Sequence, residues 1–411
     1  MRSGTHLCLP LLLITTFLAA FASPRPVLAA TQVVEQSEEY IFGESITFHA
    51  VLQSDMPVEK VDLFIDAEGN TQTLVLPAVI TPQEELVYQV GYDYDLRLQP
   101  LRAFSRISYR YEVALQAGQT FTSPTYTFYY EDNRFAWLVL EEQPFRVHWH
   151  EGGNAFGQKA LDVAQDSLQR VQSLLPLSEP RQVDIYVYAN ATELQSTLAL
   201  SQKDWVAGHA DPDLGVMVVA LPAGPDQRLL MEQRIPHELM HVLLYQHTGP
   251  VYPRLPTWLN EGLASAAELY PNPDYQILLE NARRKSSLLP MASLCHTFPR
   301  DASSALLAYA QAASFTRYLH NRFGTTGMQT LVSSYAGGVG CEQGLAAAFG
   351  ESLSQLERQW RRDILAENLA LTALANLLPW LVLLLAPLAA PLFLMLFRLR
   401  AKTFGEQGTG D

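Results

Sequence analysis

Basic residues are scarce in this chain: 28 lysines and arginines stand against 42 aspartates and glutamates, a formal net charge of −14 over 411 residues. Nucleic-acid binding calls for basic patches, so this balance excludes nucleic acid as the expected partner. Cysteine is scarcer still, with three in all. Residues 31–132 contain none, so no disulfide pins that region, and the cysteines elsewhere lack the spacing of zinc ligands.

Charge is absent from a long stretch between Glu367 and Arg398. Within it, residues 377–397 are apolar and long enough to cross about 30 Å of hydrocarbon. Basic residues follow from Arg398 onward, which by the positive-inside rule places a tail at 398–411 in the cytoplasm. We therefore predict one transmembrane helix at 377–397, kinked by its prolines, in a single-pass protein of the cell membrane whose catalytic part lies outside the cytoplasm.

The first 30 residues have the pattern of a secretory signal peptide. Arg2 supplies the positive start, residues 7–22 form a short apolar stretch, and small residues near Ala30 offer a cleavage site. An uncleaved anchor is the alternative. Removal of this segment leaves Cys295 and Cys341, an even pair that in an oxidising compartment predicts a disulfide. Two buried free thiols are the other interpretation.

The run His237-Glu238-Leu239-Met240-His241 carries the clearest chemistry. Residues four apart lie on one face of a helix, so both imidazoles can reach one metal ion, with Glu238 beside it. Catalytic zinc takes three protein ligands and leaves one position open. Glu261, in the run Trp258-Leu259-Asn260-Glu261-Gly262, is the predicted third ligand from a second helix. The plain alternative is surface histidines and solvated glutamates.

Together the two motifs resemble those of the gluzincins, the thermolysin-like and aminopeptidase N-like metallopeptidases, and best match the peptidase MA-like family over roughly 137–364. The Trp258 to Gly262 run is close to the aminopeptidase N-like form, whereas the interval from His241 to Glu261 is the thermolysin-like one. The aminopeptidase motif Gly-Ala-Met-Glu-Asn is absent, so aminopeptidase specificity does not follow. The resemblance implies one Zn²⁺ per chain and a peptide or protein substrate.

The resemblance also assigns roles. Glu238 would be the general base that takes a proton from zinc-activated water and passes it to the leaving amine. Tyr309 matches a catalytic tyrosine that stabilises the oxyanion, although a core tyrosine fits the same helix face. Glu268 matches a glutamate that would accept a hydrogen bond from a metal-ligating histidine, with a solvated side chain as the alternative.

Three further features carry expectations. By resemblance, the strand at 215–220 would be the sheet edge along which an extended peptide pairs, unless it is an internal strand. Pro236 predicts a helix start or a kink directly before the metal motif. His148 and His150 share one strand face, and we interpret them as partly buried histidines at a domain junction rather than a second metal site.

The predicted fold class is α+β. Period-two alternation with turn signals predicts an N-terminal antiparallel β-sandwich at 31–132, of the immunoglobulin or fibronectin type. Residues 133–368 mix strands and helices before turning helical, which with the resemblance predicts a zincin-like catalytic domain. The expected helices cover 155–175, 194–200, 274–285, 304–323 and 352–366, the last opening on a capping box at Ser352.

These observations predict a membrane-anchored, extracytoplasmic zinc metallopeptidase that hydrolyses peptide bonds. A catalytically silent surface protein, binding a partner through the sandwich on a zincin scaffold, is the alternative. Glu238 argues against it, because a binding module does not need that residue. Zinc-dependent hydrolysis of a non-peptide bond is a third option.

Overall fold

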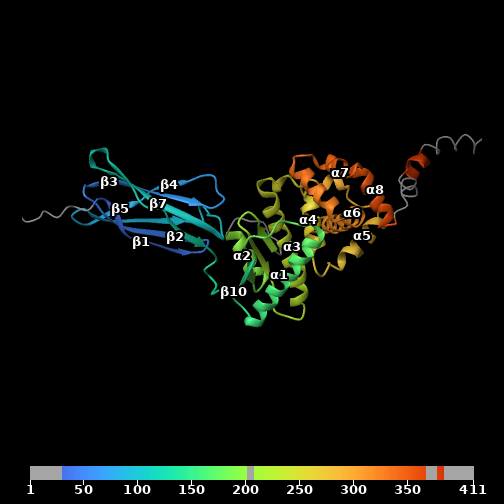
Figure 1. The fold of residues 1–411 in the computed structure, drawn as a ribbon, viewed down its shortest axis with the longest axis horizontal. Coiled ribbons are helices and arrows are strands. Elements are labelled where there is room, and N and C mark those ends of the chain that lie inside the picture. The colour runs from blue at the N-terminus through green and yellow to red at the C-terminus, as the bar shows by residue number, and fades with distance from the viewer. Residues whose placement is uncertain (1–29, 201–207, 367–376, 384–411) are drawn as a thin grey trace, which may run out of the picture.

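Two antiparallel sheets form the N-terminal part of the computed structural model, which describes residues 30–200, 208–366 and 377–383 (Figure 1). The first sheet has the strand order β1-β2-β6-β5 and the second β4-β3-β7-β8, with β9 also paired to β7. The strands are β1 (Gln32–Ile41), β2 (Ser45–Gln53), β3 (Val58–Ala67), β4 (Leu74–Pro77), β5 (Val79–Glu84), β6 (Val87–Asp95), β7 (Ser105–Leu115), β8 (Thr120–Thr122) and β9 (Tyr126–Tyr130), with a short 3₁₀ turn η1 (Gln116–Gly118) between β7 and β8.

Alternation along these strands builds the sandwich. Ile46, Phe48 and Ala50 of β2 are fully buried, while the residues between them face outward or are only partly covered. Val61 and Leu63 of β3 face them within the same core. Because successive side chains of a strand point to opposite faces, each sheet buries one face against the other. The predicted pair of packed antiparallel sheets is present.

A mixed five-stranded sheet follows, in the order β10-β11-β12-β14-β13. Its central pairs β11–β12 and β12–β14 are parallel, and both outer strands are antiparallel to their neighbours. The strands are β10 (Leu138–Glu142), β11 (Phe145–Trp149), β12 (Val183–Tyr188), β13 (Gly208–Asp211) and β14 (Val216–Ala220). The expectation that residues 215–220 form the sheet edge is wrong: β14 is buried between β12 and β13, so β13 is the edge strand.

Helices α1 and α3 cover one face of this sheet, α2 packs on the opposite face, and the later helices form the C-terminal half of the fold (Figure 1). Ile185 and Met217 face the helical core, whereas Tyr186 and Val218 face the sandwich core. The helices are α1 (Asn154–Leu174), α2 (Ala191–Leu200), α3 (Gln227–Thr248), η2 (Gly249–Arg254), α4 (Thr257–Ala267), α5 (Asp274–Arg284), η3 (Met291–Leu294), α6 (Ala302–Ala336), α7 (Cys341–Phe349) and α8 (Leu353–Asp363).

Helix boundaries largely follow local chemistry. Gly324 has φ 66° inside α6, so the helix breaks at the residue where the sequence predicts its end. Ser352 and Gln355 form the expected capping box at the start of α8. The antiparallel sheets followed by a helical half confirm the α+β part of the predicted fold class.

Pro236 lies inside α3, which runs from Gln227 to Thr248. The prediction of a helix start or kink at this proline is therefore wrong. Proline lacks the N–H that would bond the carbonyl four residues earlier, that of Glu232. That carbonyl instead accepts the backbone N–H groups of Leu269 at 2.9 Å and Tyr270 at 3.3 Å. The chain after α4 thus satisfies the acceptor that the proline leaves free.

The predicted transmembrane helix is also wrong. Within the described ranges, no helix is both long and apolar enough to cross a membrane. A span needs about 20 helical residues, and the described helix in this region covers 377–383. The prediction relied on apolar length and treated the recurring prolines as kinks within one span, although each proline removes a backbone donor. The predictions of a single-pass membrane location and of the membrane as a partner depended on this helix, so they are not supported either.

Other predictions about the chain ends fall on residues that the structure does not describe. Residues 384–397 of the predicted span and the predicted tail at 398–411 lie outside the described residues. The same holds for residues 1–29 of the predicted signal peptide.

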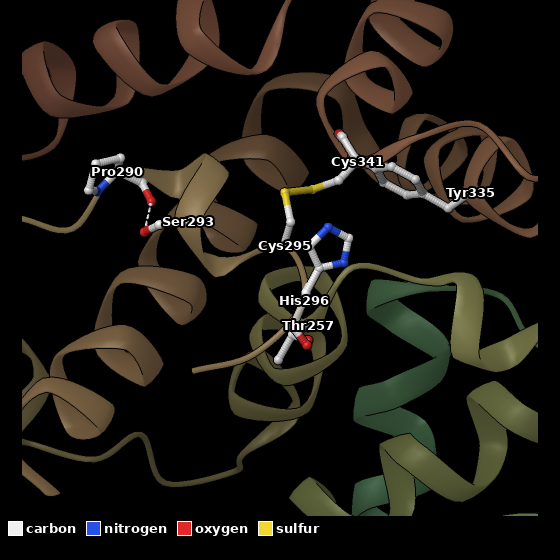
Figure 2. Close-up of a disulfide and its surroundings, with 7 residues drawn as sticks. All are labelled: Thr257, Pro290, Ser293, Cys295, His296, Tyr335 and Cys341. Atoms are coloured by element: carbon white, nitrogen blue, oxygen red, sulfur yellow. Dashed lines mark hydrogen bonds between the residues drawn. A yellow bond between two sulfur atoms is a disulfide. The ribbon is translucent and has the colours of Figure 1, made fainter. Parts of the chain in front are cut away.

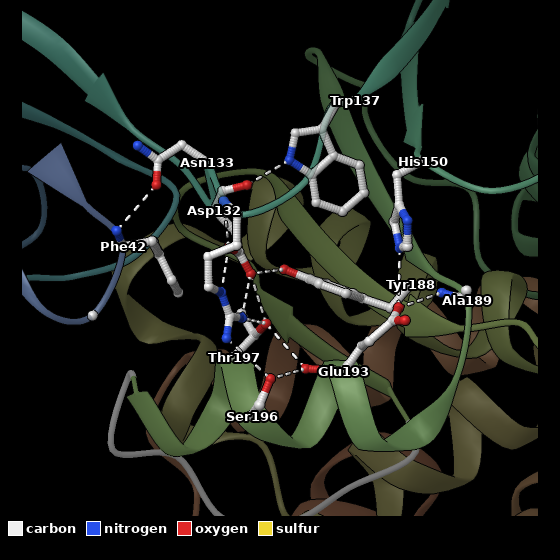
Figure 3. Close-up of polar contacts among 12 residues, drawn as sticks. Phe42, Asp132, Asn133, Trp137, His150, Tyr188, Ala189, Glu193, Ser196 and Thr197 are labelled. Atoms are coloured by element: carbon white, nitrogen blue, oxygen red, sulfur yellow. Dashed lines mark hydrogen bonds and ion pairs between the residues drawn. The ribbon is translucent and has the colours of Figure 1, made fainter.

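Asp132 joins the sandwich to the mixed sheet (Figure 3). Its carboxylate is fully buried and accepts two hydrogen bonds from Arg134, at 2.8 and 2.6 Å. Tyr188 of β12 and Thr197 of α2 donate to the same carboxylate at 3.1 and 2.8 Å. The Trp137 indole donates to the Asp132 carbonyl at 2.8 Å. A buried charge with this many donors is well compensated, so the junction is held by a saturated polar network.

A second connection comes from Arg102, which lies between β6 and β7. Its guanidinium pairs with both carboxylate oxygens of Asp213, directly after β13, and reaches Asp211 of β13 at 3.3 Å. The hydrogen bond from Arg102 is the main cause that holds the pKa of Asp213 below its usual range. Ion pairs from Arg102 therefore connect the sandwich to one end of the edge strand.

Asp132→Ala should destabilise the fold by about 3 kcal/mol, because it leaves Arg134, Tyr188 and Thr197 without their shared acceptor in a buried site. Urea denaturation of the variant beside the exposed control Glu59→Ala measures this. Equal unfolding free energies for the two variants would show that the network contributes nothing.

Candidate functional site

Helices α3 and α4 bring three potential metal ligands together. His237 and His241 lie one turn apart on α3, with ring centroids 5.3 Å apart. Oε2 of Glu261, on α4, lies 3.4 Å from Nε2 of His237 and 3.7 Å from Nε2 of His241. One ligand atom from each residue lies within 4.8 Å of the others. The sequence-predicted set converges on one point.

The donor set fits a zinc ion. Two imidazole nitrogens and one carboxylate oxygen form a ligand group of the kind found in catalytic zinc sites, with room for a fourth position. Tetrahedral bonds of about 2.0–2.1 Å separate neighbouring ligand atoms by about 3.3 Å. The distances from Glu261 to His237 and His241 are close to that value. Among the described residues, these three are the one such group of His, Cys, Asp and Glu side chains.

Gly262 lets α6 approach the ligand helix. A Cβ at this position would lie 2.7 Å from the carbonyl oxygen of Ala312 and 2.2 Å from Oγ1 of Thr316, both on α6. Any side chain there would push α6 away. The glycine that follows Glu261 in the motif therefore has a packing role, and it brings Tyr309 of α6 towards the site.

Each histidine has a partner for its second ring nitrogen. Glu268, which is 7% exposed, places Oε1 3.3 Å from Nδ1 of His237, as the resemblance implied. The backbone bonds from Leu269 and Tyr270 to α3 hold Glu268 in this place. If Nε2 held a metal ion, Nδ1 would carry the proton and donate to this carboxylate, which would orient the ring.

The partner of His241 was not foreseen from the sequence. Nδ1 of His241 lies 3.1 Å from the hydroxyl of Tyr252, which also accepts a hydrogen bond from Asn260 at 2.7 Å. Burial is the first cause that raises the pKa of Tyr252 above its ordinary range, so the phenol stays protonated. Tyr252 lies in η2, where neither helical nor strand periodicity marks it. Only its position shortly after the metal motif offered a signal.

Glu238 projects beside the metal ligands and is 9% exposed. The edge strand β13 passes directly over it: a Cβ at Gly208 would lie 2.6 Å from Oε1 of Glu238. The absence of a side chain at residue 208 therefore makes room for the carboxylate. This glycine was not predicted from the sequence, because no local pattern links it to Glu238, 30 residues later.

Tyr309 lies next to the ligands, with its ring centroid 6.3 Å from that of His237. Phe298 packs edge-on against it at 5.0 Å. Burial, followed by the charges of Glu261 and Glu238, raises the pKa of the Tyr309 phenol beyond its ordinary range. The phenol therefore stays a hydrogen-bond donor at neutral pH.

The ligands also perturb one another electrostatically. Burial alone would lower the pKa of His237, but hydrogen bonds with Glu261 and Glu268 outweigh it and raise the pKa to about 10. Burial of Glu261 opposes ionisation, yet the charge of His241 and the contact with His237 lower its pKa overall. The His237 imidazole therefore holds its proton more strongly than an ordinary histidine, and a metal ion would have to displace that proton.

His148 and His150 are not brought to a common point. Nε2 of His148 pairs with Asp184 at 2.9 Å. Nε2 of His150 pairs with Glu193 at 3.0 Å (Figure 3). Each imidazole has its own carboxylate, which supports the interpretation of partly buried structural histidines at the junction.

The predicted disulfide between Cys295 and Cys341 is present, with Cα atoms 5.9 Å apart (Figure 2). The segment around Cys295 also contacts the helix that carries Glu261. The Cys295 carbonyl accepts the backbone N–H of Thr257 at 2.9 Å, and the Thr257 hydroxyl donates to the carbonyl of His296 at 2.7 Å. Thr257 begins α4, so the cross-linked segment fixes the start of the helix that carries Glu261.

Residues 163–366 match the family model described as the Peptidase MA superfamily. This segment belongs to the Peptidase MA superfamily. It contains the ligand group, Glu238 and Tyr309, so the predicted resemblance to gluzincin peptidases is confirmed. A comparison of the chain with curated proteins gave no match.

Three solved structures illustrate a distant similarity. A mutant of an M1 zinc metallopeptidase from Deinococcus radiodurans is 12% identical, with a TM-score of 0.35, over 80% of this chain and 94% of its own. A polysaccharide deacetylase from Bacillus cereus is 10% identical, with a TM-score of 0.20, over 43% and 57%. A β-1,3-glucan binding domain of carbohydrate-binding module family 56 is 13% identical, with a TM-score of 0.17, over 24% and 99%.

Tyr252→Phe removes the hydroxyl that holds His241 and should weaken zinc binding by about 10-fold or more, as loss of a partner of a metal ligand does. Competition with a chromophoric chelator measures the affinity. Tyr245→Phe is the matched control, because its ring packs 5.8 Å from that of Tyr252 while its hydroxyl bonds no described residue. Equal affinities in the two variants would contradict the role of Tyr252.

Zinc affinity should rise with pH by about tenfold per unit up to about pH 10, because the metal must displace the His237 proton. The sign follows from the raised pKa. Protonation of His237 stabilises the metal-free fold fully below about pH 6.5, and this stabilisation is lost as pH approaches about 10. Chelator competition at several pH values in this window measures the slope. A flat profile would contradict it.

Proposed function

We propose that this chain is a zinc-dependent peptidase, with residues 133–368 as its catalytic unit and peptides or proteins as substrates. The observation that carries the proposal is the convergence of His237, His241 and Glu261, with Glu238 beside them, inside a Peptidase MA segment. A binding module needs no buried glutamate next to a three-ligand metal group, which favours hydrolysis.

His237, His241 and Glu261 would hold the zinc ion, oriented by Glu268 and Tyr252. Zinc in such a site supplies Lewis-acid chemistry, which polarises a carbonyl and acidifies water. The rest falls to the protein's own groups and to their geometry.

Glu238 would act as the general base. Its carboxylate takes a proton from the attacking water and then delivers it to the nitrogen of the leaving amine. Partial burial under β13 keeps the carboxylate from bulk solvent and restricts its orientation. Tyr309 keeps its phenolic proton, so it can donate a hydrogen bond to the substrate oxygen as that atom gains negative charge.

The edge strand offers a place for the substrate backbone. Among the described strands, β13 pairs on one side only, with β14, and its first residue faces Glu238. An extended peptide added along the open edge would make main-chain hydrogen bonds next to the general base. Arg102 holds the far end of this strand through Asp211 and Asp213. Backbone pairing favours a peptide over a non-peptide substrate.

Glu238→Gln should keep zinc and lower hydrolysis by about 10²–10⁴-fold, because the amide cannot accept the proton. Cleavage profiling of a peptide library with the purified chain measures the loss, and metal analysis confirms loading. Glu232→Gln, two turns earlier on α3 and paired with Arg228 at 2.7 Å, is the matched control and should stay active.

Glu261→Ala should lose both zinc affinity and activity, which separates ligand loss from loss of the base. Full activity of Glu238→Gln would refute the mechanism. No cleavage by zinc-loaded wild type would favour the silent binding protein instead.

A further inference from the structure

A second cavity lies on the helical half, between α5, α6 and the chain that follows α8. Its volume is about 610 Å³, which is in the range of small-molecule sites. None of the three metal ligands lines it. Its lining divides into a polar and an apolar part, and the residues that matter here are Tyr275, Leu279, Arg283, Arg317, Ile364 and Leu365.

Two arginines line this cavity without a close ion pair to a described residue. Arg283 comes from α5 and Arg317 from α6, and neither guanidinium makes an ion pair or a hydrogen bond with any described residue. Both side chains are partly buried. Burial is the main cause that lowers the pKa of Arg317, yet an arginine stays charged at neutral pH. A partly buried cation without a partner is costly, so these positions call for an anion.

Nearby charges do not fill that need. Glu268 acts on Arg317 through space but is already engaged with His237 at 3.3 Å. Glu280 also lines the cavity, and its carboxylate accepts a hydrogen bond from Gln276 at 3.1 Å. Arg170 adds further positive charge near Arg317. The field at Arg317 therefore favours a negative ligand.

The rest of the lining specifies the body of that ligand. Leu279, Ile364 and Leu365 give the cavity an apolar wall. Burial raises the pKa of Tyr275 above its ordinary range, so its phenol stays neutral. A multiply charged phosphate would make no favourable contact with this apolar wall. A carboxylate with a short hydrocarbon chain would contact both the arginines and the apolar wall.

We propose that this cavity binds a small aliphatic carboxylate, with the anionic end on Arg317, Arg283 nearby, and the hydrocarbon chain against Leu279 and Ile364. The guanidinium of Arg317 presents a planar fork of donors that matches a carboxylate. The site is distinct from the metal centre, because His237, His241 and Glu261 are not among the residues that line the cavity. It does not depend on peptidase activity.

Isothermal titration calorimetry of the zinc-loaded full chain with sodium hexanoate tests this. Hexanoate should bind, and acetate, inorganic phosphate and the neutral analogue hexanamide should each bind at least about tenfold more weakly. Arg317→Gln should weaken hexanoate binding by at least about tenfold, whereas Arg317→Lys keeps the charge without the fork and should fall between. Arg284→Gln is the matched control, because this exposed neighbour of Arg283 bonds Asn281 and does not line the cavity.

Three results would overturn the proposal: no measurable heat with hexanoate, equal binding of hexanamide or phosphate, or unchanged binding in Arg317→Gln. Unaltered circular dichroism and zinc content in the variants separate loss of the ligand site from loss of the fold. Because the readout is binding, its failure leaves the peptidase proposal standing, and failure of that proposal leaves this one standing.

Discussion

One backbone carbonyl joins the two helices that carry the three potential metal ligands. Pro236 cannot bond the carbonyl of Glu232, and the N–H groups of Leu269 and Tyr270 bond it instead. This pairing docks the end of α4 on α3. It fixes Glu268 beside His237 and leaves Glu261 facing both imidazoles. The geometry of the ligand group therefore depends on hydrogen bonds to a carbonyl that, in a helix without proline, would accept an N–H group of the same helix.

The remaining supports act on the same two helices from outside. The disulfide segment bonds Thr257 at the start of α4, and Gly262 lets α6 pack closely on it. On the other side, β13 covers Glu238. Each of these supports joins a segment distant in sequence to the ligand helices, so the centre is held by tertiary structure rather than by one local motif.

The ligand residues were predictable because their chemistry is local. A helical spacing of four places His237 and His241 on one face, and the Glu261 motif follows within a short interval. The Cys295–Cys341 pairing was predictable because only these two cysteines remain in the sequence after the predicted signal peptide. The alternation of apolar and polar residues likewise predicted the sandwich strands, because a sheet that buries one face requires that pattern.

What escaped prediction depends on partners far along the chain. Whether β14 lies inside the sheet is decided by β13, a short strand with little pattern of its own. The continuity of α3 through Pro236 needs an external donor to Glu232, which no helix propensity shows. The role of Tyr252 depends on how η2 folds back towards His241. At the C-terminus, apolar composition was mistaken for a helix long enough to span a membrane.

The attachment of the edge strand to the sandwich has a physical character unlike the rest of the site. Arg102 holds Asp211 and Asp213 by charge, with side chains between 13% and 31% exposed, whereas the ligand helices are held by buried backbone bonds and packing. Mobile ions screen partly exposed pairs far more than buried contacts. Ionic strength therefore acts as a selective solvent variable, loosening the strand above Glu238 while leaving the cation-binding geometry beneath it intact.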